Sequence, residues 1–81
     1  MKVLLFGKIR EDFSNSELNL EIDNNVTFDI IFNMINKHIN LNLYNNLMYS
    51  LNHEYVHYDN FSETIVNNND IIAIIPPINA G

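Results

Sequence analysis

The sequence closes with DIIAIIPPINAG, where the group with chemistry of its own is the α-carboxylate of Gly81. Pro76 and Pro77 lack a backbone N–H, so they end strand pairing and favour an extended path. The five residues after Pro76 span about 17 Å at full extension, and the small side chains of Ala80 and Gly81 suit a narrow site on another protein. The pattern predicts a terminal carboxylate that can reach a buried site on another protein.

A second candidate is the pair His53 and His57, which lie four residues apart beside Glu54 and Asp59. On a helix this spacing could bind a metal ion. The segment is instead typical of a hairpin, in which His53 lies in the turn while His57 and Asp59 share a face. We therefore expect no metal site. The serines lack the context of a catalytic triad, and a chain with two glycines has no phosphate-cradling loop.

The composition indicates one small domain of 81 residues with a formal net charge of -6. This charge argues against partners that are nucleic acids or anionic membranes, and it suits a protein with a basic face. The absence of cysteine excludes disulfides, thiolate nucleophiles and cysteine-based metal sites. No apolar run approaches the roughly 18 residues that a membrane span needs. We expect a soluble, cytoplasmic protein.

Hydrophobic periodicity predicts the elements that must position the C-terminal segment. Helical spacing of apolar residues, with Thr27 as an N-cap whose hydroxyl accepts from a backbone N–H, predicts a helix from Phe28 to Ile39. Asn52 and His53 form the expected tight turn between two strands. Short apolar or alternating runs predict five strands, namely Lys2–Gly7, Glu17–Ile22, Leu47–Asn52, Glu54–Tyr58 and Asp70–Ile75.

The order strand, strand, helix, strand, strand, strand predicts an α+β architecture, with a mixed sheet packed on one main helix. The last strand is apolar on both faces, so we expect it at the sheet centre beside the first. The helix covers one face only. On the other face we expect Phe6, Ile75 and Tyr55 to form an apolar patch next to the start of the C-terminal segment, as partner sites often do.

This element order is also that of the β-grasp, or ubiquitin-like, fold. Three stretches, KVLLFGKIRE, LNHEYVHYD and NDIIAIIPPINAG, look like the small subunit of molybdopterin synthase. In that family the first strand is followed by Arg-Glu, and an Asp-led last strand is followed by Pro-Pro, two variable residues and Gly-Gly. The resemblance covers nearly the whole chain, and its closing motif is the more specific part.

The resemblance implies a β-grasp domain over residues 1–75 and a flexible tail over residues 76–81. An adenylating enzyme of the ubiquitin-activating type would use ATP to activate Gly81, and a sulfurtransferase would supply the sulfur of a thiocarboxylate. The tail would enter the large synthase subunit and donate sulfur to cyclic pyranopterin monophosphate. The chain itself would bind no cofactor and hold no catalytic side chains. The interface would include Phe6, Tyr55 and Ile75, and the tail comprises Pro76, Pro77, Ile78, Asn79 and Ala80.

One position departs from the family, because Ala80 stands where the family has glycine. The extra methyl group could clash in a narrow channel, and it would cost roughly 1–2 kcal/mol if that position needs positive φ. Two alternatives stay open. One is a sulfur carrier for thiazole synthesis or tRNA thiolation, and the other is a ubiquitin-like modifier or binding module without sulfur transfer. The chain length and the PPINAG motif favour the synthase subunit.

Overall fold

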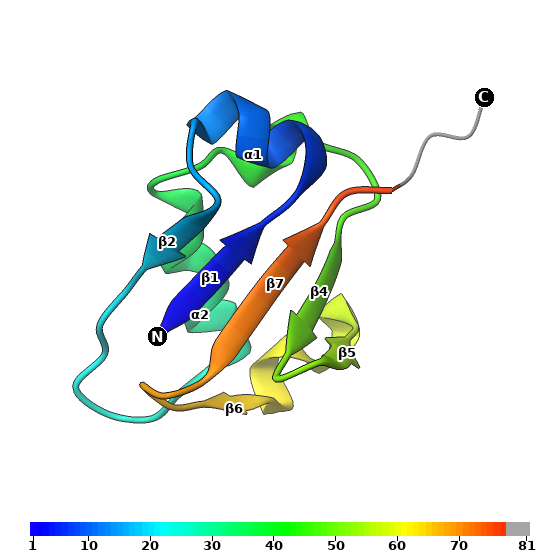
Figure 1. The fold of residues 1–81 in the computed structure, drawn as a ribbon. Coiled ribbons are helices and arrows are strands. Elements are labelled where there is room, and N and C mark those ends of the chain that lie inside the picture. The colour runs from blue at the N-terminus through cyan, green and yellow to red at the C-terminus, as the bar shows by residue number, and fades with distance from the viewer. Residues whose placement is uncertain (78–81) are drawn as a thin grey trace.

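The computed structural model of the chain describes residues 1–77, and it contains a five-stranded mixed sheet in the order β2-β1-β7-β4-β5 (Figure 1). The central strands β1 and β7 run parallel, and the other pairs are antiparallel. The strands are β1 (Lys2–Leu5), β2 (Glu17–Asn19), β4 (Met48–Leu51), β5 (Glu54–Val56) and β7 (Ile71–Ile75). All five expected strands are present, and each is shorter than its sequence pattern suggested, because end residues such as Phe6 and Asn52 begin a helix or form a turn.

The core lies between this sheet and α2 (Phe28–Asn36), which crosses behind the sheet in Figure 1. Alternation along β1 and β7 buries one set of side chains against the helix, as expected. The fully buried members include Val3, Leu5, Phe28, Ile31, Ile35, Ile72 and Ile74. Removal of these apolar surfaces from water is the main stabilising contribution to the fold.

Helix α2 ends three residues before the predicted Ile39. The chain turns there, and the Asn36 side chain accepts a 2.8 Å hydrogen bond from the Leu41 backbone N–H. Thr27 lies at the N-cap as predicted, but its hydroxyl bonds to the Asp29 carboxylate and caps no backbone N–H. The predicted capping bond is therefore wrong, while Asp29 still lies in the first turn, where the helix dipole favours a negative charge.

A second helix, α1 (Gly7–Phe13), connects β1 to β2. Ile9 is its buried residue and anchors it to the core. Asp12 stabilises the exposed side of α1 through two contacts. It pairs with Lys8, one helical turn earlier, at 3.1 Å, and it accepts a 2.6 Å hydrogen bond from the Tyr44 hydroxyl. These contacts fix the helix that begins directly after β1.

Four short elements outside the large sheet were not predicted from the sequence. A two-stranded sheet pairs β3 (Val26–Thr27) with β6 (Ile65–Val66), and two 3₁₀ turns, η1 (Leu41–Leu43) and η2 (Tyr58–Glu63), lie between these strands in sequence. Phe61 packs on Phe28 with ring centroids 4.6 Å apart and anchors η2 to the core. Ile65, in contrast, is 58% exposed. None of the helices within residues 1–77 is long and apolar enough to cross a membrane.

Candidate functional site

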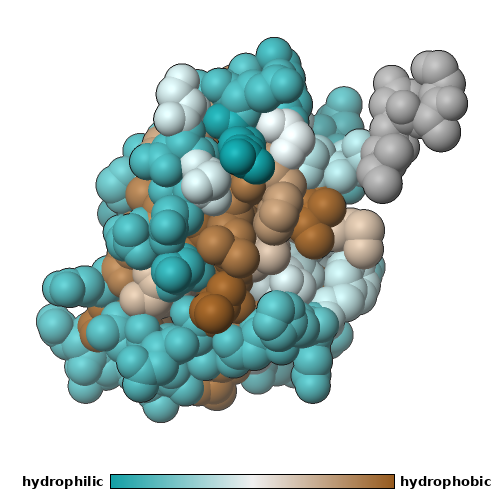
Figure 2. Space-filling view, in the orientation of Figure 1, coloured by the Kyte–Doolittle hydropathy of each residue, from teal (hydrophilic) through white to brown (hydrophobic). Residues whose placement is uncertain are grey.

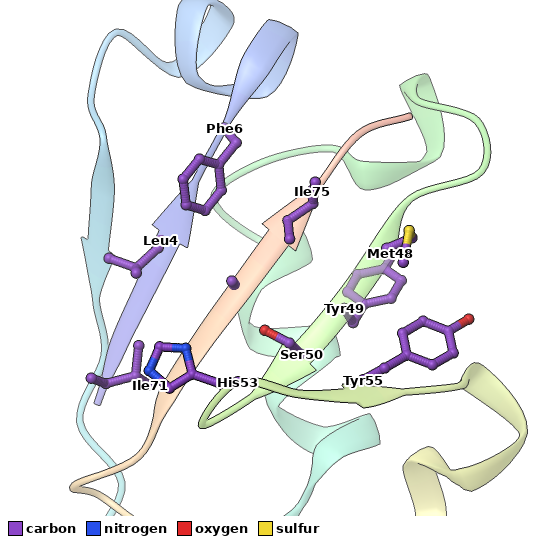
Figure 3. Close-up of a pocket in the computed structure, with 10 residues that line it drawn as sticks. Leu4, Phe6, Met48, Tyr49, Ser50, His53, Tyr55, Ile71 and Ile75 are labelled. Atoms are coloured by element: carbon purple, nitrogen blue, oxygen red, sulfur yellow. The ribbon is translucent and has the colours of Figure 1, made fainter. Parts of the chain in front are cut away.

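The face of the large sheet that α2 leaves uncovered carries a shallow apolar groove. Its volume is about 330 Å³, and Figure 2 shows hydrophobic side chains gathered over β1 and β7 on this face. The alternation that sends Val3 and Ile72 into the core sends their neighbours outward. Principal lining residues are Leu4, Phe6, Met48, Tyr55, Ala73 and Ile75 (Figure 3).

The three interface residues expected from the sequence all line this groove. Phe6 and Ile75 lie at the end where β1 and β7 finish, and Tyr55 lies across the groove on the edge strand β5 (Figure 3). Their side chains are 40%, 39% and 59% exposed. Contiguous apolar exposure of this kind makes the groove a candidate docking surface.

Met48 is a groove residue that the sequence analysis missed. It is 49% exposed, and it is the register partner of Ile75 in the antiparallel pair of β4 and β7. The alternation of β4 was the available signal, because it places Met48 and Ser50 on one face. Leu4 and His53 line the groove as well. The apolar surface therefore extends from the end of β7 across to the β4–β5 turn.

Gly7 and Pro76 meet where the C-terminal segment leaves the sheet. Parallel pairing aligns Leu5 with Ile74, and the two chains continue side by side for two more residues. Gly7 has φ +58, and a Cβ placed on it would lie 2.7 Å from the Cγ of Pro76. From the sequence, Gly7 was expected only to end the first strand. The structure shows a close contact that requires its lack of a side chain.

The buried side chain of Asp70 and the exposed side chain of Asn52 form a polar lock at the opposite end of β7. The Nδ2 of Asn52 donates to Asp70 over 2.8 Å, and the N–H of Asn67 donates to the second carboxylate oxygen over 2.8 Å. The Oδ1 of Asn52 accepts from the Ile71 N–H over 2.9 Å. Asn52 and His53 have φ of 51 and 74, which confirms the predicted turn. The lock holds the β4–β5 hairpin, and thus Tyr55, against β7.

Charge is unevenly distributed along the chain. The sequence from His38 to Gly81 contains four carboxylic side chains, on Glu54, Asp59, Glu63 and Asp70, and no lysine or arginine. Three of these carboxylates belong to β5 and to η2, which follows it directly on the Tyr55 side of the groove. The uneven charge suits a partner whose docking face is basic.

His57 and Asp59 interact locally. The Nδ1 of His57 accepts a 3.2 Å hydrogen bond from the Asp59 N–H and lies 3.4 Å from its carboxylate. His53 lies in the hairpin turn, on the groove side. Within residues 1–77 no group of three or more histidine or acidic side chains could hold a metal ion.

The predicted tail falls on both sides of the described boundary. Pro76 and Pro77 follow β7, and neither belongs to a strand, in agreement with their expected role as its end. The predicted residues Ile78, Asn79, Ala80 and Gly81 lie outside the described residues. The Gly7–Pro76 contact and the Phe6–Ile75 end of the groove both lie where the tail begins.

Comparison with known proteins decides the family. The sequence profile of the ThiS family matches residues 3–81. The chain belongs to the ThiS family. This ThiS-family protein is 35% identical to the molybdopterin synthase sulfur carrier subunit of Dictyostelium discoideum, over 99% of its own length and 94% of that relative. The sequence resemblance to that class of subunit is thereby confirmed.

Solved structures share the fold of this ThiS-family protein. SAMP1 of Haloferax volcanii has a TM-score of 0.81 at 15% identity, with 100% of this chain and 98% of that chain covered. A chain in the complex of subunits 1 and 2 of molybdopterin-converting factor from Helicobacter pylori has a TM-score of 0.68 at 16% identity, with coverage of 99% and 96%. The expected β-grasp fold is confirmed.

Proposed function

We propose that this ThiS-family protein is the sulfur-carrier subunit of a molybdopterin synthase. The observation that carries the proposal is the 35% identity, across almost the full length of both chains, to a subunit of that name. The apolar groove beside the end of β7 supports it, because a carrier needs a docking surface close to the reactive segment. The chain would bind no cofactor itself, and the active site would lie in a larger partner subunit.

The chemistry would take place on the carboxylate of Gly81. A ubiquitin-activating-type enzyme joins this carboxylate to the AMP part of ATP and releases pyrophosphate. A sulfide equivalent from a sulfurtransferase then forms a C–S bond as the bond to AMP breaks, which leaves a thiocarboxylate. Transfer of this sulfur to cyclic pyranopterin monophosphate, with water as the source of the replacing oxygen, returns Gly81 to a carboxylate. The carrier acts in the cytoplasm in this proposal.

The described residues would dock and orient this carrier. Phe6, Met48 and Ile75 present apolar surface at the point where the tail begins, so a partner that covers them receives the tail at the edge of its contact area. The acidic side chains around Tyr55 add attraction for a basic partner face. Acid–base groups and oxyanion stabilisation come from the partner, since the groove is largely apolar.

A second candidate keeps the carrier chemistry and changes the acceptor, to a thiazole precursor or a tRNA. The family match itself favours this alternative, because a ThiS profile covers residues 3–81. A third candidate is a ubiquitin-like modifier or binding module, in which Gly81 forms an amide with a lysine or stays unmodified. Ala80, in place of the glycine expected from the resemblance, gives the unmodified form some support.

Intact-mass analysis separates the carrier functions from the rest. The protein is incubated with its own activating enzyme, ATP and a sulfur donor, and we expect a mass gain that matches sulfur replacing oxygen on the fragment that contains Gly81. An unchanged mass, with enzymes that are active on a control carrier, would overturn the proposal. Formation of molybdopterin after addition of the large subunit and cyclic pyranopterin monophosphate then separates the synthase from the thiazole and tRNA alternatives.

A further inference from the structure

The geometry points to Gly7 as a positioning residue for the C-terminal segment. We infer that its bare Cα seats the ring of Pro76 and thereby sets the direction in which the chain leaves the sheet. This inference rests on the proposed carrier function, because direction matters only if a partner must receive the tail. Gly7 is assigned no contact with the reacting atoms, and its effect acts through Pro76.

The contact is set up by the parallel pair at the sheet centre. Leu4 pairs with Ala73 and Leu5 with Ile74. Beyond this register the first chain turns into α1 at Gly7, while the second continues as Pro76, which has no N–H to prolong the ladder. The two chains therefore separate at this point, and the ring of Pro76 lies against the β1–α1 junction at Gly7.

The available space identifies glycine as the residue that this junction needs. A Cβ on Gly7 would lie 2.7 Å from the Cγ and 3.6 Å from the Cδ of Pro76, and the first distance is shorter than carbon atoms tolerate. The pyrrolidine ring can shift its Cγ only by a change of pucker, which is a smaller displacement than the rotamer change available to a flexible side chain. Pro76 would have to move away from α1 and carry the following residues with it.

A small rotation at Pro76 produces a large displacement at the tip. When a partner holds the segment beyond it in an extended form of about 17 Å, a rotation of about 20° at Pro76 moves its end by about 6 Å. Misplacement of reacting groups by about 1 Å can cost a reaction about a hundredfold. The contact between Gly7 and Pro76 therefore affects delivery of the Gly81 carboxylate, although the contact lies far along the chain from that group.

Gly7 also has positive φ, so Gly7→Ala introduces backbone strain besides the overlap. A double-mutant cycle separates the two effects. Pro76→Ala removes Cγ and Cδ and leaves a Cβ 3.9 Å from the added methyl, which is an ordinary contact. The backbone strain of Gly7→Ala is common to the single and double variants, and Pro76→Ala in the natural background measures the effect of the proline change alone. The coupling that remains after both single effects are subtracted reports the Gly7–Pro76 contact.

The experiment measures sulfur transfer at saturating large subunit, together with the Kd for that subunit. We expect Gly7→Ala to slow transfer at least tenfold while Kd changes less than threefold, and Gly7→Ala/Pro76→Ala to be at least fivefold faster than Gly7→Ala. A double variant as slow as Gly7→Ala would overturn the inference, as would a Gly7→Ala variant as fast as the natural protein. If Gly7→Ala does not fold, Pro76→Ala must reduce transfer more than Pro77→Ala, or the inference fails.

NMR of the isolated protein tests the Gly7–Pro76 contact directly, without any partner, and so tests it independently of the proposed function. We expect a nuclear Overhauser contact between the Gly7 Hα protons and the Pro76 Hγ protons. Its absence in a protein that still transfers sulfur would overturn the positioning role and leave the carrier function standing. Its presence in a protein that never acquires sulfur would overturn the carrier function and leave the contact established.

Discussion

Asn52 and Asp70 tie the hairpin that carries Tyr55 to the central strand of the sheet. The Asn52 amide group donates to the Asp70 carboxylate over 2.8 Å and accepts from the N–H of Ile71 over 2.9 Å. Asp70 is 9% exposed, so its carboxylate depends on these hydrogen bonds within the protein. The Asn52 side chain thus connects the β4–β5 turn to Ile71, the first residue of β7. This connection fixes the side of the groove on which Tyr55 lies.

Asp70→Ala should destabilise the fold by about 2–3 kcal/mol, because it leaves the Asn67 N–H and the Asn52 amide without their acceptor. In a domain of this size such a loss lowers Tm by roughly 10–20 °C. Thermal unfolding followed by circular dichroism measures the shift. Asp23→Ala makes the same chemical change at an exposed carboxylate and should leave Tm within about 2 °C. Equal shifts for both variants would contradict the role of the lock.

The Tyr44–Asp12 hydrogen bond gives the domain a pH dependence at the alkaline end. It raises the pKa of Tyr44 from 10.0 to about 12. Because the folded pKa lies above the unfolded one, this stabilisation is complete below pH 10 and is lost as the pH rises towards 12. The same hydrogen bond, followed by the one from Lys8, lowers the pKa of Asp12. That contribution is present above the ordinary pKa of 3.8 and disappears as the pH falls through the lowered value.

Tyrosinate absorbance against pH tests the alkaline effect. The chain has four tyrosines, and burial also raises the pKa of Tyr49, so the assignment rests on a difference between variants. Asp12→Asn should shift one late titration towards pH 10, and Asp59→Asn, at an exposed carboxylate beside His57, should leave the curve unchanged. A curve that Asp12→Asn does not alter would contradict the hydrogen bond.

The sequence was sufficient for the large sheet and its two faces. Alternation in Lys2–Leu5 and Ile71–Ile75 identified both the core side and the open side, because side chains on a strand alternate whatever its partner is. That is why Phe6 and Ile75 were correctly placed on the open face. Tyr55 was also expected on this face. Its position on the edge strand, across the groove from Phe6, was not predicted, because it depends on the order of the strands.

The remaining features depend on contacts between distant parts of the chain. Two-residue strands such as Ile65–Val66 are too short for periodicity to reveal, and α1 buries one apolar residue, Ile9, in an otherwise polar segment. The contact between Gly7 and Pro76 joins the two ends of the domain and leaves no local pattern. It emerges only when the parallel register of β1 and β7 is known.

Phe6→Asp should weaken binding of the proposed large synthase subunit about thirtyfold, because it puts a charge into an apolar contact beside the start of the tail. Isothermal titration calorimetry measures the Kd. The control is Leu43→Asp, which alters an apolar side chain that is 74% exposed and lies in η1, away from the groove-lining residues. We expect that variant to bind within twofold of the natural protein. Similar losses for both variants would show that charge alone, without the groove, weakens the complex.

Two variants of Gly81 distinguish the effect of the length of the C-terminal segment from the effect of the size of its last side chain. Deletion of Gly81 shortens the segment by about 3.5 Å and puts the methyl group of Ala80 beside the carboxylate, whereas Gly81→Ala adds a methyl group at full length. We expect the deletion to reduce thiocarboxylate formation about a hundredfold or more, because the carboxylate no longer reaches the activating site, and Gly81→Ala to reduce it about tenfold. Intact mass over time measures both rates, and thermal unfolding should match that of the natural protein. A deletion variant that still acquires sulfur at the natural rate would place the reactive group elsewhere.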